Sequence, residues 1–172
     1  MLNNLEELAG LDRLTAMAAY DLFDPELAAE LQQICRRSAE RLNMPFSAAQ
    51  AVLDTATATL ATNAGEADSL SPLGGSPNEL TFCCQVVLDK APYLCEDLAR
   101  DPEWTAHPAV AAGLVRAYAG VPLVLPSGYT LGSHCVMAPD IRGFTDEDVR
   151  HLTAAATQIV DLISRYPHPG GR

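Results

Sequence analysis

The sequence predicts an α+β fold around one mainly antiparallel β-sheet. Amphipathic helical segments lie towards both ends of the 172-residue chain, and short apolar runs of strand character lie between them. Two of these runs are joined by Pro126-Ser127-Gly128, the strongest hairpin signal in the chain. Because 48% of the residues are hydrophobic, a single core can offset the entropy lost on folding. We therefore expect one domain over residues 11–165.

The first long helix is predicted to begin at Asp24 and Pro25. Aspartate accepts hydrogen bonds from the free N–H groups of a first turn, and proline suits the first helical position. Apolar side chains then recur at steps of three or four residues as far as Leu42, which indicates one buried helix face. An Ala-rich helix is expected before it over 11–22. Residues 1–10 are either a helical extension or a frayed end.

The middle of the chain is expected to contain strands, a loop and a short helix. Residues 46–63 mix small and β-branched residues with polar ones, which is typical of two short strands. Residues 65–78 hold three glycines, two prolines and three serines, so we expect a long loop of the kind that forms lids or binding loops. A short buried helix over 80–88 and a strand over 91–95 follow.

The next elements are helical turns and the hairpin. Asp101 and Pro102 repeat the helix start seen at residue 24, so one or two helical turns are expected around Trp104. The apolar runs over 115–125 and 129–137 then form the two strands of the hairpin.

A final helix is predicted to begin after Thr145, whose hydroxyl can cap the first turn. Three acids follow at 146–148, where negative charge is favoured by the helix dipole. An apolar stripe then continues to Ile163 and faces the sheet. Residues 166–172 are expected to form a disordered tail.

Charge and cysteine content exclude several kinds of partner and compartment. The chain carries 22 acidic and 11 basic side chains, a net charge of -11, so nucleic acid and anionic membranes would repel it. It has no apolar run of 18 residues and no lysine-rich leader, which predicts a cytoplasmic protein. Five cysteines, with no CxxC pair, lie in apolar segments, as buried cysteines of a reducing compartment do.

Several motifs occur together in one order along the chain. They are residues 20–27, Thr81-Phe82-Cys83, Glu96-Asp97-Leu98, 118–123, 131–137 and Phe144-Thr145. Together they resemble a GAF domain, of the short type found in bacterial sensor proteins, over about residues 11–163. The resemblance implies terminal helices on one face of the sheet. On the other face it implies a loop and short helices around a small-molecule cavity, and the fold alone does not choose the ligand.

Six polar and aromatic residues are expected to face this cavity: Phe82, Cys83, Trp104, His107, Arg116 and Tyr118. Ligand pockets are usually apolar, with a few convergent polar groups. A cyclic nucleotide would also need a phosphate cradle, for which Arg116, Arg100 and Lys90 are the basic candidates. A solvated arginine paired with an acid is the commoner arrangement, so the ligand is left open.

Haem and bilin are alternatives that the residues do not favour. Haem needs an axial ligand, for which His107, His134 and His151 are candidates, but no two of them have metal-ligand spacing with an acid. A bilin needs an accessible cysteine beside a histidine. His134 and Cys135 are adjacent, but side chains alternate along a strand, which predicts Cys135 in the core and His134 on the opposite face. No metal site is expected.

The enzymatic alternative is a resemblance to free methionine-R-sulfoxide reductase. Cys83 falls where that family has a cysteine at the start of its central helix, and Glu96-Asp97 follows at matching spacing. In the same register, however, the position expected to hold the nucleophilic cysteine is His107, and an imidazole cannot close a disulfide. We therefore expect no catalytic residues, with a thiol redox enzyme or sensor using Cys83 or Cys84 as the alternative.

The leading hypothesis is a sensory or signalling module that binds a small molecule and acts through a homodimer or a partner protein. The terminal helices are the expected dimer surface. Leu5, Leu8 and Leu14 favour a dimer, because an added N-terminal helix must bury its leucines somewhere.

Overall fold

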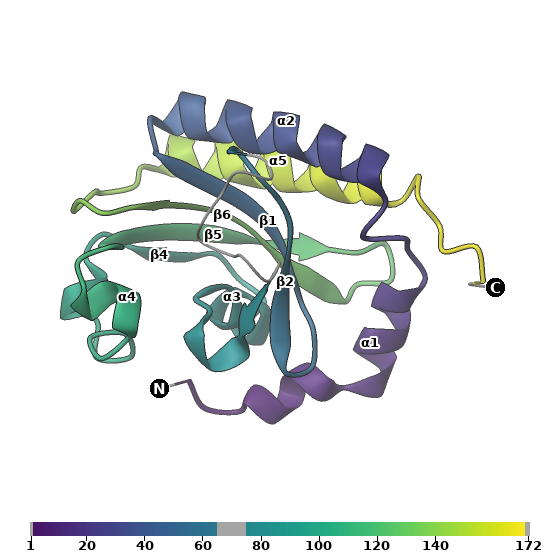
Figure 1. Cartoon of the computed structure of the whole chain (residues 1–172), viewed down its shortest axis with the longest axis horizontal. Coiled ribbons are helices and arrows are strands. Elements are labelled where there is room, and N and C mark those ends of the chain that lie inside the picture. Colours follow the sequence, from purple (N-terminus) through teal and green to yellow (C-terminus); the bar gives the residue numbers. More distant parts are fainter. Residues whose placement is uncertain (1, 65–74, 171–172) are drawn as a thin grey trace.

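The computed structural model describes residues 2–64 and 75–170, and its centre is a six-stranded sheet in which all five strand pairings are antiparallel (Figure 1). The strand order is β3-β2-β1-β6-β5-β4. The strands are β1 Phe46–Val52, β2 Ala56–Thr62, β3 Gly75–Pro77, β4 Tyr93–Cys95, β5 Ala117–Val124 and β6 Thr130–Ala138. The predicted α+β class and the hairpin between β5 and β6 are both confirmed.

Helices cover both faces of this sheet. The α-helices are α1 Leu11–Ala18, α2 Pro25–Leu42, α3 Cys83–Asp89, α4 Pro108–Ala111 and α5 Asp146–Ile163. The 3-10 helices in the described ranges are η1 Leu5–Ala9, η3 Asn78–Leu80 and η4 Leu98–Arg100. The two long helices, α2 and α5, lie side by side across one face, whereas α3 and α4 lie on the opposite side (Figure 1). This is the arrangement that the resemblance implied.

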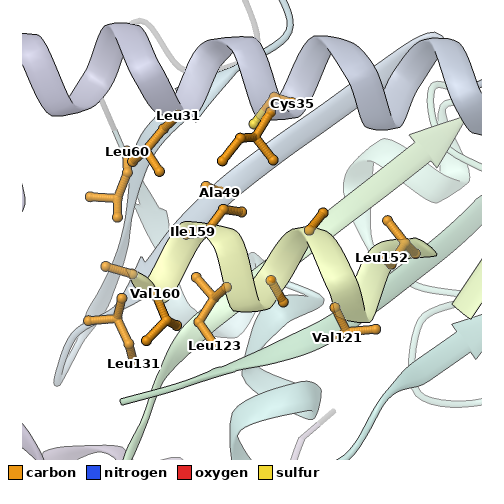
Figure 2. Packing of buried hydrophobic residues seen from close by; sticks show 14 of the residues in the cluster. Leu31, Cys35, Ala49, Leu60, Val121, Leu123, Leu131, Leu152, Ile159 and Val160 are labelled. Atoms are coloured by element: carbon orange, nitrogen blue, oxygen red, sulfur yellow. The ribbon is translucent and has the colours of Figure 1, made fainter. Parts of the chain in front are cut away.

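Each face of the sheet has its own hydrophobic cluster. The larger one fills the space under α2 and α5 and includes Leu31 of α2, Ile159 of α5 and Leu123 of β5 (Figure 2). The smaller one lies between the sheet and α3 and includes Phe82 and Tyr118. Burial on both faces explains why the central strands lack the alternating polar positions of a half-exposed sheet.

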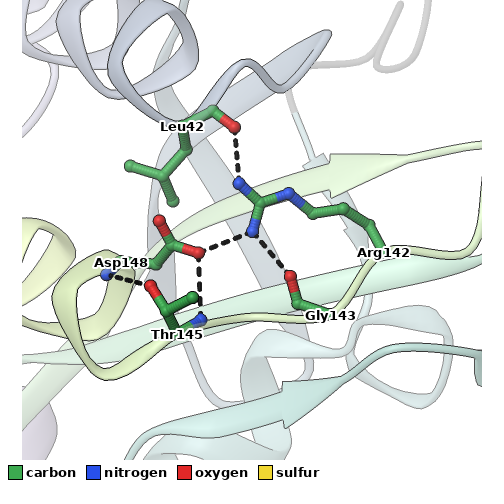
Figure 3. Close-up of polar contacts among 5 residues, drawn as sticks. All are labelled: Leu42, Arg142, Gly143, Thr145 and Asp148. Atoms are coloured by element: carbon green, nitrogen blue, oxygen red, sulfur yellow. Dashed lines mark hydrogen bonds and ion pairs between the residues drawn. The ribbon is translucent and has the colours of Figure 1, made fainter.

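The two long helices begin at the caps that the sequence indicates. Asp24 accepts hydrogen bonds from the N–H groups of Glu26 at 2.8 Å and Leu27 at 3.3 Å. At α5, the Thr145 hydroxyl accepts from the N–H of Asp148, and the Asp148 carboxylate accepts from the N–H of Thr145 (Figure 3). Such a reciprocal capping box satisfies two N–H groups that have no partner within the helix.

Arg142 joins the end of α2 to the start of α5 (Figure 3). Its guanidinium donates to the carbonyl oxygens of Leu42 at 2.6 Å and Gly143 at 2.9 Å, and to the Asp148 carboxylate at 2.7 Å. The last carbonyls of a helix lack partners within the helix, so the bond to Leu42 supplies one. The same side chain therefore sets the spacing of the two helices at this end.

Arg13 holds α1 against the ends of two central strands of the sheet. Its guanidinium donates to the main-chain carbonyls of Leu8, Val52, Thr130 and Leu131, which belong to η1, β1 and β6. The side chain is only 8% exposed, and this burial lowers its pKa. One side chain thus fixes the N-terminal segment to two central strands.

The predicted loop over 65–78 is shorter than expected at its C-terminal end. Its residues 65–74 lie outside the described part of the chain. Gly75–Pro77 instead forms the edge strand β3, paired with β2, and Asn78 begins η3. The buried Asn78 side chain accounts for this order, because it donates to the carbonyls of Leu53 and Asp54 and accepts from Thr57.

The helical turns expected around Trp104 are present as hydrogen-bonded turns, in which the N–H groups of Trp104 and Thr105 donate to the Asp101 carbonyl at 3.0 and 2.9 Å. Asp101 does accept a capping bond from the N–H of Glu103 at 2.9 Å, but the helix α4 begins only at Pro108. A residue before proline is disfavoured in the α-helical region, so His107 ends any helix started at Asp101. His107 adopts an extended conformation and caps α4.

The segments near the two chain ends differ from the expectations. The helix α1 ends at Ala18 rather than continuing to 22. Residues 166–168, expected within a disordered tail, lie against the fold: Tyr166 donates to Glu30 at 2.6 Å, Pro167 forms a bridge with Tyr20, and the N–H of His168 donates to the Ala19 carbonyl.

The N-terminal leucines are buried within the chain itself. Leu8 of η1 is 1% exposed and belongs to the smaller hydrophobic cluster, and Leu5 packs against the same cluster. Leu14 packs against the larger cluster. These leucines therefore give no reason to expect a dimer, which corrects that part of the sequence argument.

His134 is fully buried, although the predicted alternation along β6 is correct. Cys135 faces the cluster under α3, and His134 faces α2. His134 Nδ1 lies 2.9 Å from the Ala48 carbonyl oxygen and therefore carries the hydrogen, so Nε2 accepts from the Ser38 hydroxyl at 2.8 Å. Burial is the main cause that lowers the pKa of His134 to about 4.

Gly132 permits β6 to lie close to β1. A Cβ atom at this position would collide with the carbonyl oxygen of Gln50, a main-chain atom that cannot rotate away. Glycine is thus required here by the close approach of two backbones.

We expect Gly132→Ala to lower the free energy of unfolding by about 2–3 kcal/mol, because the two central strands must separate to admit the methyl group. The matched control is Gly143→Ala, whose Cβ would be no closer than 3.7 Å to Glu96. Urea unfolding measures both variants. Equal stability of the two variants would contradict a close β1–β6 approach.

We also expect the free energy of unfolding to decrease as the pH is lowered, because His134 titrates. Its folded-state pKa of about 4 lies below the ordinary value of 6.5, so protonation favours the unfolded state. The contribution is therefore complete above pH 6.5, decreases as the pH falls towards 4, and amounts in all to about 3 kcal/mol.

The comparison variant is His134→Gln, which removes this titration and leaves the other groups in place. Its unfolding free energy should change less steeply with pH than that of the wild type between pH 6.5 and 4.5, by up to about 1.4 kcal/mol per pH unit. If the two slopes are the same, His134 is not held neutral. An NMR titration of the wild-type imidazole gives the pKa directly.

Candidate functional site

Four of the six predicted pocket residues meet in one aromatic cluster on the α3 side of the sheet. Phe82, which directly precedes α3, lies at its centre. Its ring centroid is 4.7 Å from that of Trp104, 4.8 Å from that of His107 and 5.4 Å from that of Tyr118. Edge and tilted contacts of this kind add to the stabilisation from burial. The rings therefore form one continuous apolar cluster, in which Phe82, Trp104 and Tyr118 are buried.

His107 is held in a fixed orientation within this cluster. Its Nδ1 accepts a hydrogen bond from the N–H of Ala109 at 3.1 Å, and its Nε2 therefore donates to the Leu80 carbonyl at 3.1 Å. The same imidazole caps α4 and links it to η3. Both ring nitrogens are thus occupied within the protein, so His107 is not available as a haem ligand.

Trp104 carries a polar atom with no partner. The residue is 2% exposed, and its indole Nε1 is buried without a hydrogen-bond acceptor in the described part of the structure. A buried donor left unpaired costs about 1–3 kcal/mol. An unsatisfied N–H beside an aromatic surface is a feature that an acceptor on a ligand can complete.

Cys83 lies directly beneath the aromatic cluster, in a buried polar group of thiols and hydroxyls. Its Sγ is 3.2 Å from Tyr118 Oη, 2.7 Å from Gln50 Oε1 and 4.0 Å from Cys135 Sγ. Ser133 Oγ completes the group at 3.3 Å from Tyr118 Oη. Three strands and the start of α3 therefore bring five polar side chains to one point of the core.

The two thiols in this group have pKa values that move in opposite directions. Burial acts to raise the pKa of Cys83, but hydrogen bonds with Cys135, Tyr118 and Ser133 together lower it below its ordinary value. The bond to Cys83, then burial, raises the pKa of Cys135 well above its ordinary value. Burial likewise raises the pKa of Tyr118. At Cys83, therefore, the hydrogen bonds outweigh the effect of burial.

The other three cysteines lie apart from this group. Cys84 is fully buried beside Thr57, and burial raises its pKa to about 12. Cys35 lies under α2, where burial also raises its pKa to about 12. Cys95 is half-buried on β4, with a pKa raised mainly by burial. All five thiols are free.

Arg116 does not join the aromatic cluster. Its guanidinium forms two hydrogen bonds of 2.7 Å to the carboxylate of Asp97, and this bonding lowers the pKa of Asp97. Such a bidentate pair occupies one edge of the guanidinium, with its Nε–H and one terminal N–H. Lys90 and Arg100 are exposed, Lys90 at the C-terminus of α3 and Arg100 in η4. The basic side chains named for a phosphate cradle are therefore not gathered around the aromatic surface.

Metal ligation finds little support in the described segments, which hold no group of three or more His, Cys, Asp or Glu side chains placed to bind an ion. His134 is buried under α2, on the opposite face of the sheet from the aromatic cluster, and His151 lies on α5. Neither borders the predicted pocket. No helix among those described is both long and apolar enough to cross a bilayer.

Sequence reasoning missed four members of the site: Gln50, Tyr93, Ser133 and Cys135, the last of which it placed only in the core. Tyr93 stacks against Tyr118 with ring centroids 5.7 Å apart, and its hydroxyl donates to Asp101 at 2.6 Å. For Ser133 a signal was present, because a period of two places it on the same face of β6 as Cys135. Nothing in the sequence points to Gln50, whose contact with Cys83 spans 33 positions.

Comparison with known sequences identifies the family. The model of the GAF domain family matches residues 26–164. A cyclic di-GMP phosphodiesterase of Pseudomonas aeruginosa is 34% identical over 90 residues, which cover 51% of this chain and 15% of that protein. The chain therefore matches less than a sixth of the length of this relative.

Solved structures share the fold at low sequence identity. The GAF domain of an Acinetobacter phosphoenolpyruvate-protein phosphotransferase has a TM-score of 0.67 and 11% identity, covering 96% of each chain. The type II free methionine-R-sulfoxide reductase of Thermoplasma acidophilum has a TM-score of 0.66 and 17% identity, covering 86% of this chain and 98% of that one. From the family match over most of its length, and from these shared folds, the chain belongs to the GAF domain family.

Proposed function

We propose that this GAF domain is a sensory module that binds a small molecule against the aromatic cluster of Phe82, Trp104, His107 and Tyr118. The observation that carries the proposal is the buried indole N–H of Trp104, which has no acceptor within the described structure. A ligand that presents a hydrogen-bond acceptor to this N–H and a flat or apolar group to the rings would satisfy both features. GAF domains as a family are sensory and ligand-binding modules, which supports the proposal.

On this proposal, a second copy of the chain or a partner protein binds at α2 and α5 and responds to the ligand. A surface groove of about 370 Å³ lies between these helices and is lined mainly by charged and amide side chains, including Glu30, Arg37 and Gln158. Arg37 already bonds Gln158 across the helix pair at 3.3 Å, so a movement of either helix alters this surface. Five free thiols are consistent with a reducing cytoplasmic location.

We expect Trp104→Phe to weaken small-molecule binding at least tenfold, because it removes the indole N–H while keeping an aromatic ring. Native mass spectrometry of freshly purified protein measures any retained molecule and the oligomeric state together. To measure binding, the protein is dialysed to remove any retained molecule and is then incubated with the low-molecular-weight extract of the expression cells.

The control is Tyr129→Phe at the exposed hairpin turn, which also removes one hydrogen-bonding group and keeps an aromatic ring. This variant should retain the same bound small molecule, at the same occupancy, as the wild type. Equal occupancy in the Trp104→Phe variant would contradict a role for the indole, and a wild type that binds nothing from the extract would contradict the pocket itself.

A second candidate function is reduction of free methionine sulfoxide. It is favoured by the similarity to two structures of such reductases and by the position of Cys83 at the start of α3. The second of these structures, from Neisseria meningitidis, has a TM-score of 0.63 and 15% identity, and the match covers 80% of this chain and 78% of that one. Against it stands His107 at the position expected for the nucleophilic cysteine, with both nitrogens bonded within the fold.

We expect no turnover of free methionine-R-sulfoxide, since the buried thiols of Cys83 and Cys84 lack an exposed nucleophilic partner in the cluster. Incubation with the sulfoxide and dithiothreitol, followed by chromatographic measurement of methionine, tests this. Methionine formation that is lost in Cys83→Ser would establish the enzyme and displace the sensory proposal.

A further inference from the structure

Two buried thiols from distant parts of the chain face each other beneath the aromatic cluster. Cys83 lies on the first turn of α3 and Cys135 in the middle of β6, and their sulfur atoms are 4.0 Å apart. We propose that Cys83 and Cys135 form a disulfide when the protein meets a peroxide, and that this bond moves the aromatic rings around Trp104. The inference does not require that any ligand binds.

The geometry suits an intramolecular bond. Two sulfur atoms must come within ~2.05 Å to form a disulfide, so Cys83 and Cys135 must approach each other by about 2 Å. No other side chain has to be displaced from between them, since the two thiols are already in direct contact. The helix that carries Cys83 is only seven residues long, so its first turn can follow a rotation of the side chain.

The peroxide supplies the two oxidising equivalents. The Cys83 thiolate attacks one peroxide oxygen, which forms an S–O bond, breaks the O–O bond and releases water or an alcohol. The Cys135 thiol then attacks the Cys83 sulfur; the S–S bond forms, the S–O bond breaks, and water leaves with the remaining proton. Both sulfurs are oxidised, and one peroxide is reduced.

Cys83 is the thiol that starts this sequence. Tyr118 Oη donates a hydrogen bond to Cys83 Sγ at 3.2 Å, which favours a negative charge on the sulfur. Cys83 is itself only 1% exposed, but its Sγ contacts the half-buried side chain of Gln50, whose movement would open the thiol to a peroxide. Cys135 is 0% exposed and lies in the middle of the sheet, so it takes the role of the second thiol.

Cys84 is not the partner, although it is adjacent in sequence. Neighbouring residues on a helix point in different directions, and the Cys84 thiol lies 3.8 Å from Thr57 Oγ1 rather than towards Cys135. Its thiol also resists ionisation, since burial raises its pKa to about 12. Cys84 therefore serves as a matched control, with the same chemistry and burial at the next position.

The disulfide between Cys83 and Cys135 would change the aromatic cluster at which we propose that the ligand binds. Phe82 precedes Cys83 in the chain, and its ring packs 4.7 Å from Trp104. A shift of Cys83 towards β6 must turn or displace Phe82, which changes the surroundings of Trp104. Because Trp104 is the one tryptophan in the chain, its fluorescence reports this change without interference.

The experiment treats the full, reduced chain with an equal concentration of hydrogen peroxide and measures intact mass, tryptic peptides and tryptophan fluorescence. Trypsin cleaves after Arg41, Lys90, Arg116 and Arg142, so Cys135 lies in a peptide separate from Cys83 and Cys84. We expect a loss of about 2 Da, one hydrogen from each thiol, and a link between the peptides 42–90 and 117–142. Dithiothreitol should reverse the mass loss and the fluorescence change together.

Variants assign the bond to its two cysteines. Cys84→Ala should form the same linked peptides at the wild-type rate, whereas Cys83→Ala and Cys135→Ala should not form them. Circular dichroism establishes that each variant is folded, and a variant that is not folded is replaced by the serine substitution. Three outcomes would each overturn the proposal. They are a link through Cys84 or Cys95, a disulfide between two chains, and thiols that remain reduced in the folded wild type.

Discussion

The register of β6 between β1 and β5 is the constraint on which the other features depend. Side chains alternate along a strand, so this register sends His134 towards α2 and Cys135 towards α3. A shift by one residue would exchange them, burying an imidazole among the thiols and a thiol opposite Ser38. Gly132 maintains the register because only a residue without a side chain fits against the carbonyl of Gln50. The two chemical environments of the protein are thus set by one strand.

Two arginines that bond main-chain carbonyls join elements that are far apart in the chain. Arg13 connects η1, β1 and β6, and Arg142 connects the end of α2 with the start of α5. A guanidinium has five donors in a fixed plane, so it can satisfy several carbonyls that no strand or helix partner reaches. Among the described residues, the contacts of Arg13 are to carbonyls rather than to a carboxylate. Its burial is therefore offset by hydrogen bonds from many acceptors rather than by one opposite charge.

The two faces of the sheet differ in a way that suits sensing. The face under α2 and α5 is a large cluster of aliphatic side chains, with buried His134 fully bonded. The face under α3 combines aromatic rings, an unpaired indole N–H and a group of thiols and hydroxyls. Short helices and turns cover this second face, and these elements have less packing to hold them than the long helices. A chemical change there can therefore alter the structure locally while the helix face stays intact.

The sequence by itself determined the fold class, both helix caps and the alternation along β6, because hydrophobic period and capping chemistry are local properties. It also named Phe82, Trp104, His107 and Tyr118, which the tertiary structure brings into contact. Only the tertiary structure decided that Arg116 pairs with Asp97, that Leu8 is covered by its own chain, and that Gln50 and Cys135 meet Cys83. These contacts join residues far apart in the chain, and their geometry follows from strand order and register, which no local pattern encodes.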